Sequence, residues 1–164
     1  MPSNDMRPRQ KTLVGMFNHV LTTYAEGFMS AFTRVHARSY GKPLGRLFDL
    51  YFPAPVFALT VRGRRTGAPR TVMLILTRDG DDLVVAGSNG GNPKLPAWYL
   101  NLREAGEAIA TIDNRQIAVR FREVSESERE RYWGLLTKNY RHFDTYDAMT
   151  SRKIPLGVLE PLNA

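Results

Sequence analysis

The fold is limited most strongly by a series of short apolar segments in the middle of the chain, each followed by turn residues. Segments rich in β-branched residues cover Val56–Arg62, Thr71–Thr77 and Leu83–Gly87, a composition typical of strands. Asp79-Gly80 lies between the second and third segments and favours a tight hairpin turn. Because hairpins join antiparallel strands, this region predicts an antiparallel sheet rather than a doubly wound parallel one.

A second hairpin and a last strand continue this pattern. Glu107–Asp113 and Gln116–Val124 flank the turn pair Asp113-Asn114, and Ile154–Leu159 is apolar enough for a final strand. With helices expected before and after the strands, the arrangement predicts an α+β fold, a small antiparallel barrel with peripheral helices.

Helices are predicted at both ends of the strand region. Apolar residues recur at helical spacing near the N-terminus, which predicts an amphipathic first helix. Ser125 and Glu128 match the capping-box pattern, which opens a later helix. The expected helices cover 12–38, Leu95–Arg103, 126–139 and Asp144–Thr150.

Length and composition restrict the organisation and the chemistry. A chain of 164 residues supports one core, so we expect a single domain over 12–164 behind a disordered leader at 1–11. The absence of cysteine excludes disulfides and thiolate chemistry. It suits a reducing cytoplasm, and the start lacks the pattern of a secretory signal, so we expect a cytoplasmic protein. His19, His36 and His142 lack metal-ligand spacing, so no metal is expected.

Positive charge gathers in one hairpin tip. The net charge is +7, and Arg62–Arg70, which reads R-G-R-R-T-G-A-P-R, carries four arginines. Gly63 and Gly67 allow close backbone approach, and guanidinium and Thr66 hydroxyl groups donate to phosphate or carboxylate oxygens. The alternative is a solvated turn. No DNA-binding or RNA-binding module surrounds the loop, so no nucleic acid is expected.

Two further segments follow the same strand region. Ala86-Gly87-Ser88-Asn89-Gly90-Gly91 is a glycine-rich strand end, which is either a simple turn or a surface on which a flat ring lies. Pro96-Ala97-Trp98-Tyr99-Leu100-Asn101 has helical spacing. Its aromatic residues are core residues by default, and a cofactor contact is the alternative. Neither a G-x-G-x-x-G motif after a strand nor a P-loop is present.

The three segments together carry a family resemblance. The order G-R-R-T-G-x-P-R, A-G-S-N-G-G and P-x-W-Y-x-N resembles the deazaflavin-dependent nitroreductase family, which uses coenzyme F420. The resemblance continues through Tyr132-Trp133 and Arg152-Lys153-Ile154-Pro155-Leu156, and it covers about residues 50–161. It implies a split β-barrel of the kind found in FMN-binding, pyridoxamine-phosphate-oxidase-like proteins, and with that fold a homodimer.

The resemblance also implies the residues that contact the cofactor. The phosphate and oligoglutamate tail would be held by Arg64, Arg65, Thr66 and Arg70, and its path lined by Thr71, Val72, Met73, Leu74 and Ile75. The deazaflavin ring would lie against Ala86, Gly87, Ser88 and Asn89, with Ala97, Trp98, Tyr99, Leu100 and Asn101 closing the pocket. Asn89 departs from the lysine that relatives often carry after the serine.

Catalytic expectations rest on a few hydroxyl groups. Ser88 would polarise the ring, and Tyr140 or Tyr146 would donate a proton or orient the substrate. Phe143 lies in the same substrate-pocket region, where nitro-reducing relatives place tyrosines. Because phenylalanine cannot hydrogen-bond a nitro group, this difference argues against nitroimidazole activation.

The leading hypothesis is therefore an F420-dependent oxidoreductase that transfers hydride to a small electron-poor acceptor such as a quinone, an enone or a nitroaromatic compound. An F420-reducing enzyme would be an indirect partner. One alternative is an FMN-binding split-barrel oxidoreductase. Another is a non-catalytic F420 carrier or membrane-surface protein, in which the helix over 12–38 contacts the cytoplasmic face of a membrane.

Overall fold

The computed structural model describes residues 54–162 together with Leu13 and Met16. Within this part of the chain, all strand pairings are antiparallel, and seven strands form one sheet in the order β2-β1-β5-β6-β7-β4-β3. The strands are β1 (Val56–Arg62), β2 (Pro69–Ile75), β3 (Thr77–Asp79), β4 (Asp82–Ala86), β5 (Glu107–Ile112), β6 (Arg115–Glu123) and β7 (Leu156–Pro161).

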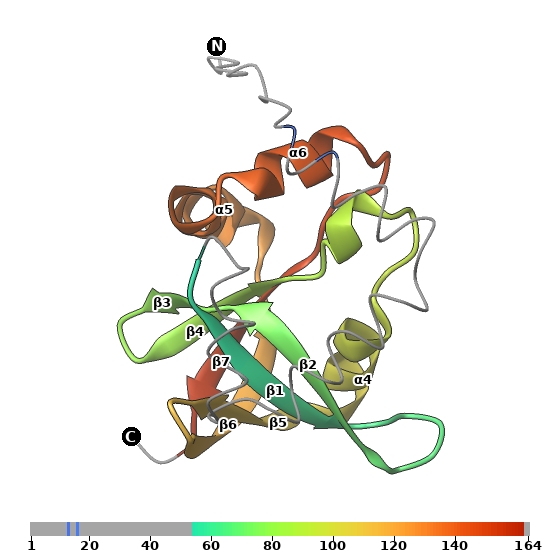
Figure 1. Cartoon of the computed structure of the whole chain (residues 1–164), viewed down its shortest axis with the longest axis vertical. Helices are drawn as coiled ribbons and strands as arrows, with labels where there is room; N and C mark the ends of the chain where they lie inside the picture. The colour runs from blue at the N-terminus through green and yellow to red at the C-terminus, as the bar shows by residue number, and fades with distance from the viewer. Residues whose placement is uncertain (1–12, 14–15, 17–53, 163–164) are drawn as a thin grey trace.

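The sheet is curled because its two edges are neighbours in sequence. β2 and β3 stand at opposite ends of the strand order, but only Leu76 separates them. The two edges therefore approach each other at Leu76, and the sheet curls into a half-barrel (Figure 1). At the junction, the amide of Leu76 donates to the carbonyl of Pro55 at 2.8 Å instead of to a sheet partner.

Both predicted hairpins are confirmed, and their turns have the expected left-handed backbone. Gly80 has φ 62° in the turn between β3 and β4. Asp113 and Asn114 have φ 48° and 65° between β5 and β6. Two consecutive positive φ values match the twist of a two-residue antiparallel hairpin, which is why this dipeptide joins the strands directly.

The helices of the described region lie at the ends and on one face of the barrel (Figure 1). They are η1, a short 3-10 turn (Asn89–Gly91), α4 (Ala97–Ala105), α5 (Glu126–Asn139) and α6 (His142–Ala148). The predicted capping box is present at the start of α5, where the Ser125 amide donates to a Glu128 carboxylate oxygen at 3.1 Å. Among the described residues, no helix has the length and apolarity needed to cross a bilayer.

Two main apolar clusters stabilise the fold. The barrel interior holds Phe57, Leu59, Val85 and Leu159, and Leu102 of α4 closes it. A second cluster lies between the β4–β7 part of the sheet and helices α5 and α6. The structure therefore has the α+β split-barrel architecture that the sequence predicts.

Several element boundaries differ from the predicted ones, mostly beside proline. The predicted strand Thr71–Thr77 divides at Leu76 into β2 and β3, because its two halves pair with opposite edges of the sheet. β7 begins at Leu156 because Pro155 has no amide for a central ladder. α4 begins at Ala97, with Pro96 extended at the N-cap.

Predictions for the N-terminal part are largely outside the described residues. This applies to the leader at 1–11 and to the helix over 12–38, of which the structure describes only Leu13 and Met16. These two residues are helical and exposed.

Candidate cofactor-binding site

The arginine-rich loop between β1 and β2 is held in shape by its own backbone. The amide of Gly63 donates to the carbonyl of Ala68 at 2.8 Å, and the amide of Gly67 donates to the carbonyl of Gly63 at 2.7 Å. Gly67 has φ 68°, which favours glycine. A Cβ at Gly63 would lie 3.0 Å from the Ala68 carbonyl oxygen. Both glycines are therefore needed for this closed loop.

Arg64 ties the loop to α4, which lies beside this end of the barrel (Figure 1). Its Nη1 donates to the side-chain oxygen of Asn101 at 2.8 Å and to the carbonyl of Ala97 at 3.4 Å. Its backbone amide points to the same Asn101 oxygen at 3.3 Å. Asn101 is itself buried, so it is a fixed anchor. Two predicted site residues that are 37 positions apart in sequence are thus in direct contact.

The other arginines of the loop differ from Arg64 in their surroundings. Arg62, Arg65 and Arg70 are exposed, and they form no ion pair with any residue in the described part of the chain. The first turn of α4 carries no acidic residue, so the positive pole of the helix is not neutralised there. Guanidinium groups and a helix N-terminus at one corner of the protein suit a phosphate or carboxylate ligand.

β2 carries the predicted tail path on both of its faces. Val72 and Leu74 pack with the barrel interior, whereas Met73 is buried in a small cluster on the opposite face. Thr71 is exposed, and its hydroxyl hydrogen-bonds that of Thr60 at 2.8 Å. Alternate side chains of a strand point to opposite faces, so this segment offers a ligand mainly its backbone and one hydroxyl.

The glycine-rich segment after β4 is a tightly constrained turn. Asn89, Gly90 and Gly91 all have left-handed φ values, of 49°, 59° and 80°. The preceding Gly87 has little room for a side chain, because a Cβ there would lie 3.0 Å from Pro155 and 3.1 Å from the Tyr99 ring. Ser88, which lies between Gly87 and Asn89 in the chain, is 8% exposed.

Tyr99 supports this turn from behind. The ring is fully buried, and its hydroxyl donates toward the Leu156 carbonyl at 3.2 Å and a Glu123 oxygen at 3.3 Å. Burial, with the nearby Glu123 charge, raises the pKa of Tyr99 above its ordinary value. Trp98 is half-buried against the barrel core. Tyr99 thus lies within the core and Trp98 at its edge, while a contact of either residue with the cofactor stays a prediction.

The predicted substrate residues form one aromatic cluster. The hydroxyls of Tyr140 and Tyr146 are 3.0 Å apart, and Phe143 packs edge-on against both rings at 5.3 Å and 6.1 Å. All three residues are only 6–7% exposed. The neighbouring His142 is also buried, and this burial lowers the pKa of its imidazole. α6 packs against η1, so the cluster lies next to the glycine-rich turn.

Comparison with known proteins decides the family. The sequence profile described as F420H(2)-dependent quinone reductase matches residues 30–161. An F420H(2)-dependent quinone reductase of Mycobacterium tuberculosis (strain ATCC 25618 / H37Rv) is 31% identical over 130 residues, covering 77% of this chain and 87% of the relative. The chain belongs to this family.

Solved structures agree with the assignment. An F420-H2 dependent reductase, FDR-A, superposes with a TM-score of 0.61 at 28% identity, covering 65% of this chain and 94% of that one. A structure described as a domain-swapped dimer also gives 0.61, at 25% identity, covering 71% and 93%. Membership in the F420H(2)-dependent quinone reductase family confirms the predicted F420-dependent oxidoreductase class and coenzyme F420 as the cofactor.

Two features of this family member were not among the predicted site residues. One is Arg152, which donates to the carbonyls of Ser88 and Asn92. Arg152 belongs to the Arg152-Lys153-Ile154-Pro155-Leu156 segment of the family resemblance, which implies no role for it. Only the fold brings it to the turn.

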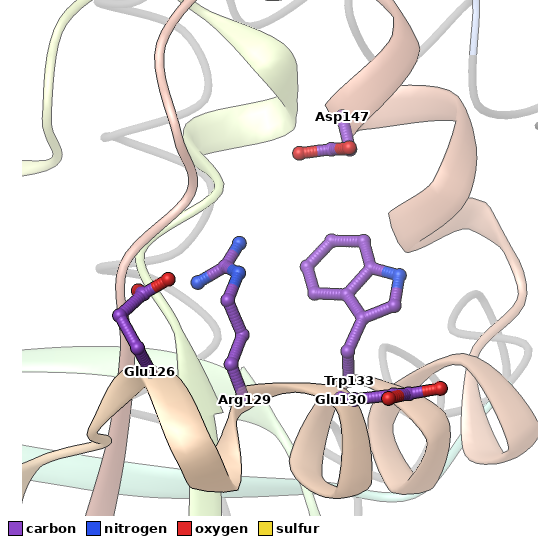
Figure 2. A pocket seen from close by; sticks show the side chains of 5 residues that line it. All are labelled: Glu126, Arg129, Glu130, Trp133 and Asp147. Atoms are coloured by element: carbon purple, nitrogen blue, oxygen red, sulfur yellow. The ribbon is translucent and has the colours of Figure 1, made fainter. Parts of the chain in front are cut away.

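The second is a cleft of about 250 Å³ between α5 and α6. Figure 2 shows its lining, in which residues of α5 face Asp147 of α6. The α5 residues have the spacing of one helix face, and this spacing is visible in the sequence. Asp147 joins them only because α6 packs beside α5. The lining residues are Glu126, Arg129, Glu130, Trp133 and Asp147.

Proposed function

We propose that the protein catalyses the two-electron reduction of a quinone with reduced coenzyme F420 as the electron donor. The single observation that supports this most directly is the arginine-rich loop, anchored on α4 through Arg64, in a chain of the F420H(2)-dependent quinone reductase family. A polyanionic cofactor tail accounts for several exposed guanidinium groups at one loop tip, whereas a neutral ligand does not.

The tail is held by the exposed part of the loop. Arg65, Arg70 and Thr66 donate to its phosphate and carboxylate oxygens, because their side chains are exposed. Arg64 contributes mainly as the anchor, since its guanidinium already donates to Asn101. The residues present fit the tail because no carboxylate lies in the loop to compete for these donors.

The ring end is received by the turn after β4. When bound, reduced F420 supplies a hydride from C5 of its deazaflavin ring. Ser88 is the hydrogen-bond donor we assign to the ring, and Gly87 lets the backbone lie flat against Tyr99. Asn89 donates to the Lys94 carbonyl at 3.0 Å, so it stabilises the turn and supplies no charge to the ring.

The reaction also requires a proton. Reduction of a quinone to a hydroquinone adds one hydride and one proton, so that two electrons and two hydrogen atoms reach the acceptor. We assign the proton donor to the Tyr140–Tyr146 hydroxyl pair, which shares one hydrogen bond of 3.0 Å. Phe143 makes this part of the cluster apolar, which favours a flat quinone ring over a nitro group.

The proposal also covers the oligomeric state of the protein and its location in the cell. The structural relative described as a domain-swapped dimer supports a homodimer for this chain. Contact between the helix over 12–38 and a membrane, and reduction of F420 by a separate enzyme, stay predictions from the sequence.

The test is direct titration. Purified protein is titrated into F420 while the fluorescence of the cofactor is recorded, with FMN in a parallel series. Saturable F420 binding, followed by quinone-dependent oxidation of reduced F420, is the expected result. Unchanged F420 fluorescence together with tight FMN binding would support the FMN alternative. Binding without quinone turnover would support a carrier.

A further inference from the structure

Arg152 joins two parts of the fold that are far apart in sequence. It lies in the bend between α6 and β7, and its side chain reaches the turn after β4. Nη2 donates to the carbonyl of Ser88 at 2.7 Å, and Nε donates to the carbonyl of Asn92 at 2.9 Å. Nε and Nη2 share one edge of the planar guanidinium, so a single rigid group spans the first and last residues of the turn.

The turn between these two carbonyls has an uncommon backbone. Three consecutive residues, Asn89 to Gly91, are left-handed, and Asn89 adopts this conformation without being glycine. The internal hydrogen bonds run from the Gly91 amide to Ser88 and from the Asn92 amide to Asn89, both at 3.0 Å. The Ser88 carbonyl therefore accepts one of the two internal bonds and a charged bond from Arg152.

The position of Arg152 is costly for an arginine. Its Nη1 is buried and makes no hydrogen bond to the residues that the structure describes. Burial lowers the pKa of Arg152, while the charge of Asp147, which lines the cleft of Figure 2, opposes this shift. A guanidinium that only served solubility would remain in water. Because this partly desolvated position is costly, we attribute it to the two hydrogen bonds that Arg152 donates to Ser88 and Asn92.

The next residue provides a contrast. Lys153 is exposed and pairs with Glu126, which is also exposed, on the surface of α5. Such exposed pairs contribute little. Lys153 is thus a surface charge, whereas the adjacent Arg152 is hydrogen-bonded to the backbone of the turn.

We propose that Arg152 is a positioning residue, which holds Ser88–Asn92 in the conformation that receives the deazaflavin ring. The identity of the ring rests on the proposed function, but the clamp on the turn is a property of the free protein. Because Arg152 acts on the ring end, its loss is expected to affect the hydride-transfer step more than the binding of the cofactor tail.

The first test uses the free protein. Amide hydrogen exchange of Gly91 and Asn92 is measured by NMR in the wild type, R152Q, R152K and the matched control K153Q. We expect exchange at these amides to rise by roughly tenfold or more in R152Q, since each charged hydrogen bond stabilises substantially. R152K should be intermediate, because an ammonium donates without the fixed fork. K153Q should match the wild type.

Exchange at the β5–β6 hairpin serves as the internal reference for overall stability. If R152Q raises exchange equally in the hairpin and in the turn, the variant has lost overall stability, and R152K is used to test the clamp instead. Selective exposure of the turn in R152K supports the clamp, whereas uniform exposure or wild-type protection at Gly91 and Asn92 overturns it.

The second test uses cofactor and a quinone. In R152Q we expect kcat to fall roughly tenfold or more while the dissociation constant of F420 changes by less than about threefold, because the tail contacts remain. R152K should recover part of kcat. Unchanged kcat in R152Q overturns the inference. If the wild type fails to bind F420, the proposed function is wrong, and the exchange experiment still decides whether Arg152 holds the turn.

Discussion

Arg64 donates from Nη1 to the side-chain oxygen of Asn101 at 2.8 Å, and this contact joins the arginine-rich loop to α4. The loop therefore does not move as a free hairpin tip. Its remaining arginines are presented from a fixed position beside the N-terminus of the helix, which reduces the ordering cost of binding an anionic tail.

Removal of the anchor should weaken cofactor binding although Asn101 need not contact the cofactor. In N101A the Arg64 guanidinium and amide lose their common acceptor. We expect the dissociation constant of F420 to rise by about tenfold, which corresponds to one lost charged hydrogen bond. The matched control is R103A, which removes an exposed cation from the same helix. Equal affinities for N101A and the wild type would contradict the anchoring role.

The tail contacts should be separable from folding. Arg65 and Arg70 are exposed and form no ion pair with described residues, so R65A/R70A should unfold at the wild-type urea concentration. F420 affinity should fall by about a hundredfold or more, and its dependence on salt should become shallower. R115A/R120A removes two exposed arginines of β6, and therefore the same charge, elsewhere in the protein. A similar loss of affinity in that control would mean that only net charge matters.

The tyrosine pair should affect turnover more than binding. In Y140F or Y146F, the bond between the two hydroxyls is lost, so proton supply to the acceptor should slow and kcat should fall, with the F420 dissociation constant unchanged. Y132F is a suitable control, because Tyr132 is buried in the same cluster and its hydroxyl accepts from Arg122 at 3.2 Å. Wild-type kcat in both variants would exclude this pair as the proton donor.

Replacement of two glycines by alanine should change the free energy of unfolding in opposite directions. A Cβ at Gly157 in β7 would lie 2.2 Å from a ring carbon of Phe121, whereas one at Gly134 in α5 meets no atom within 4 Å. G157A should lower the free energy of unfolding by about 1–3 kcal/mol through overpacking. G134A should raise it by about 0.5–1 kcal/mol, because alanine favours helix. Urea unfolding measures both, and a stable G157A would show that the Phe121 ring moves aside freely.

His142 should make stability depend on pH near neutrality. Burial, followed by the nearby charge of Arg141, lowers the pKa of His142 in the folded protein below its ordinary value of 6.5. As the pH falls below 6.5, the unfolded chain takes up the proton first, so stability present at higher pH is lost toward the folded pKa. Urea unfolding between pH 8 and pH 5 should show this loss, and H142Q should reduce it. An identical pH dependence in H142Q would assign the effect to other groups.

Features set by local chemistry were predictable from the sequence alone. The turn residues Asp113-Asn114 specify a two-residue hairpin because asparagine and aspartate tolerate left-handed φ values. Ser125 and Glu128 specify the start of α5 because both groups of the capping box lie within one turn. The ordered motifs identified the family and its cofactor. Each of these signals depends on residues close together in the chain.

Tertiary structure decided what depends on distant contacts. The break at Leu76 exists because two sheet edges meet there, and no local signal marks it. Arg64 reaches Asn101 across 37 positions, and Arg152 reaches Ser88 across 64. The sequence by itself determined the two hairpins, the start of α5 and the family of this chain. Folding decided which of the described arginines bind the protein's own oxygen atoms and which are exposed at the loop tip, because only a packed chain exchanges solvent around each side chain for specific partners.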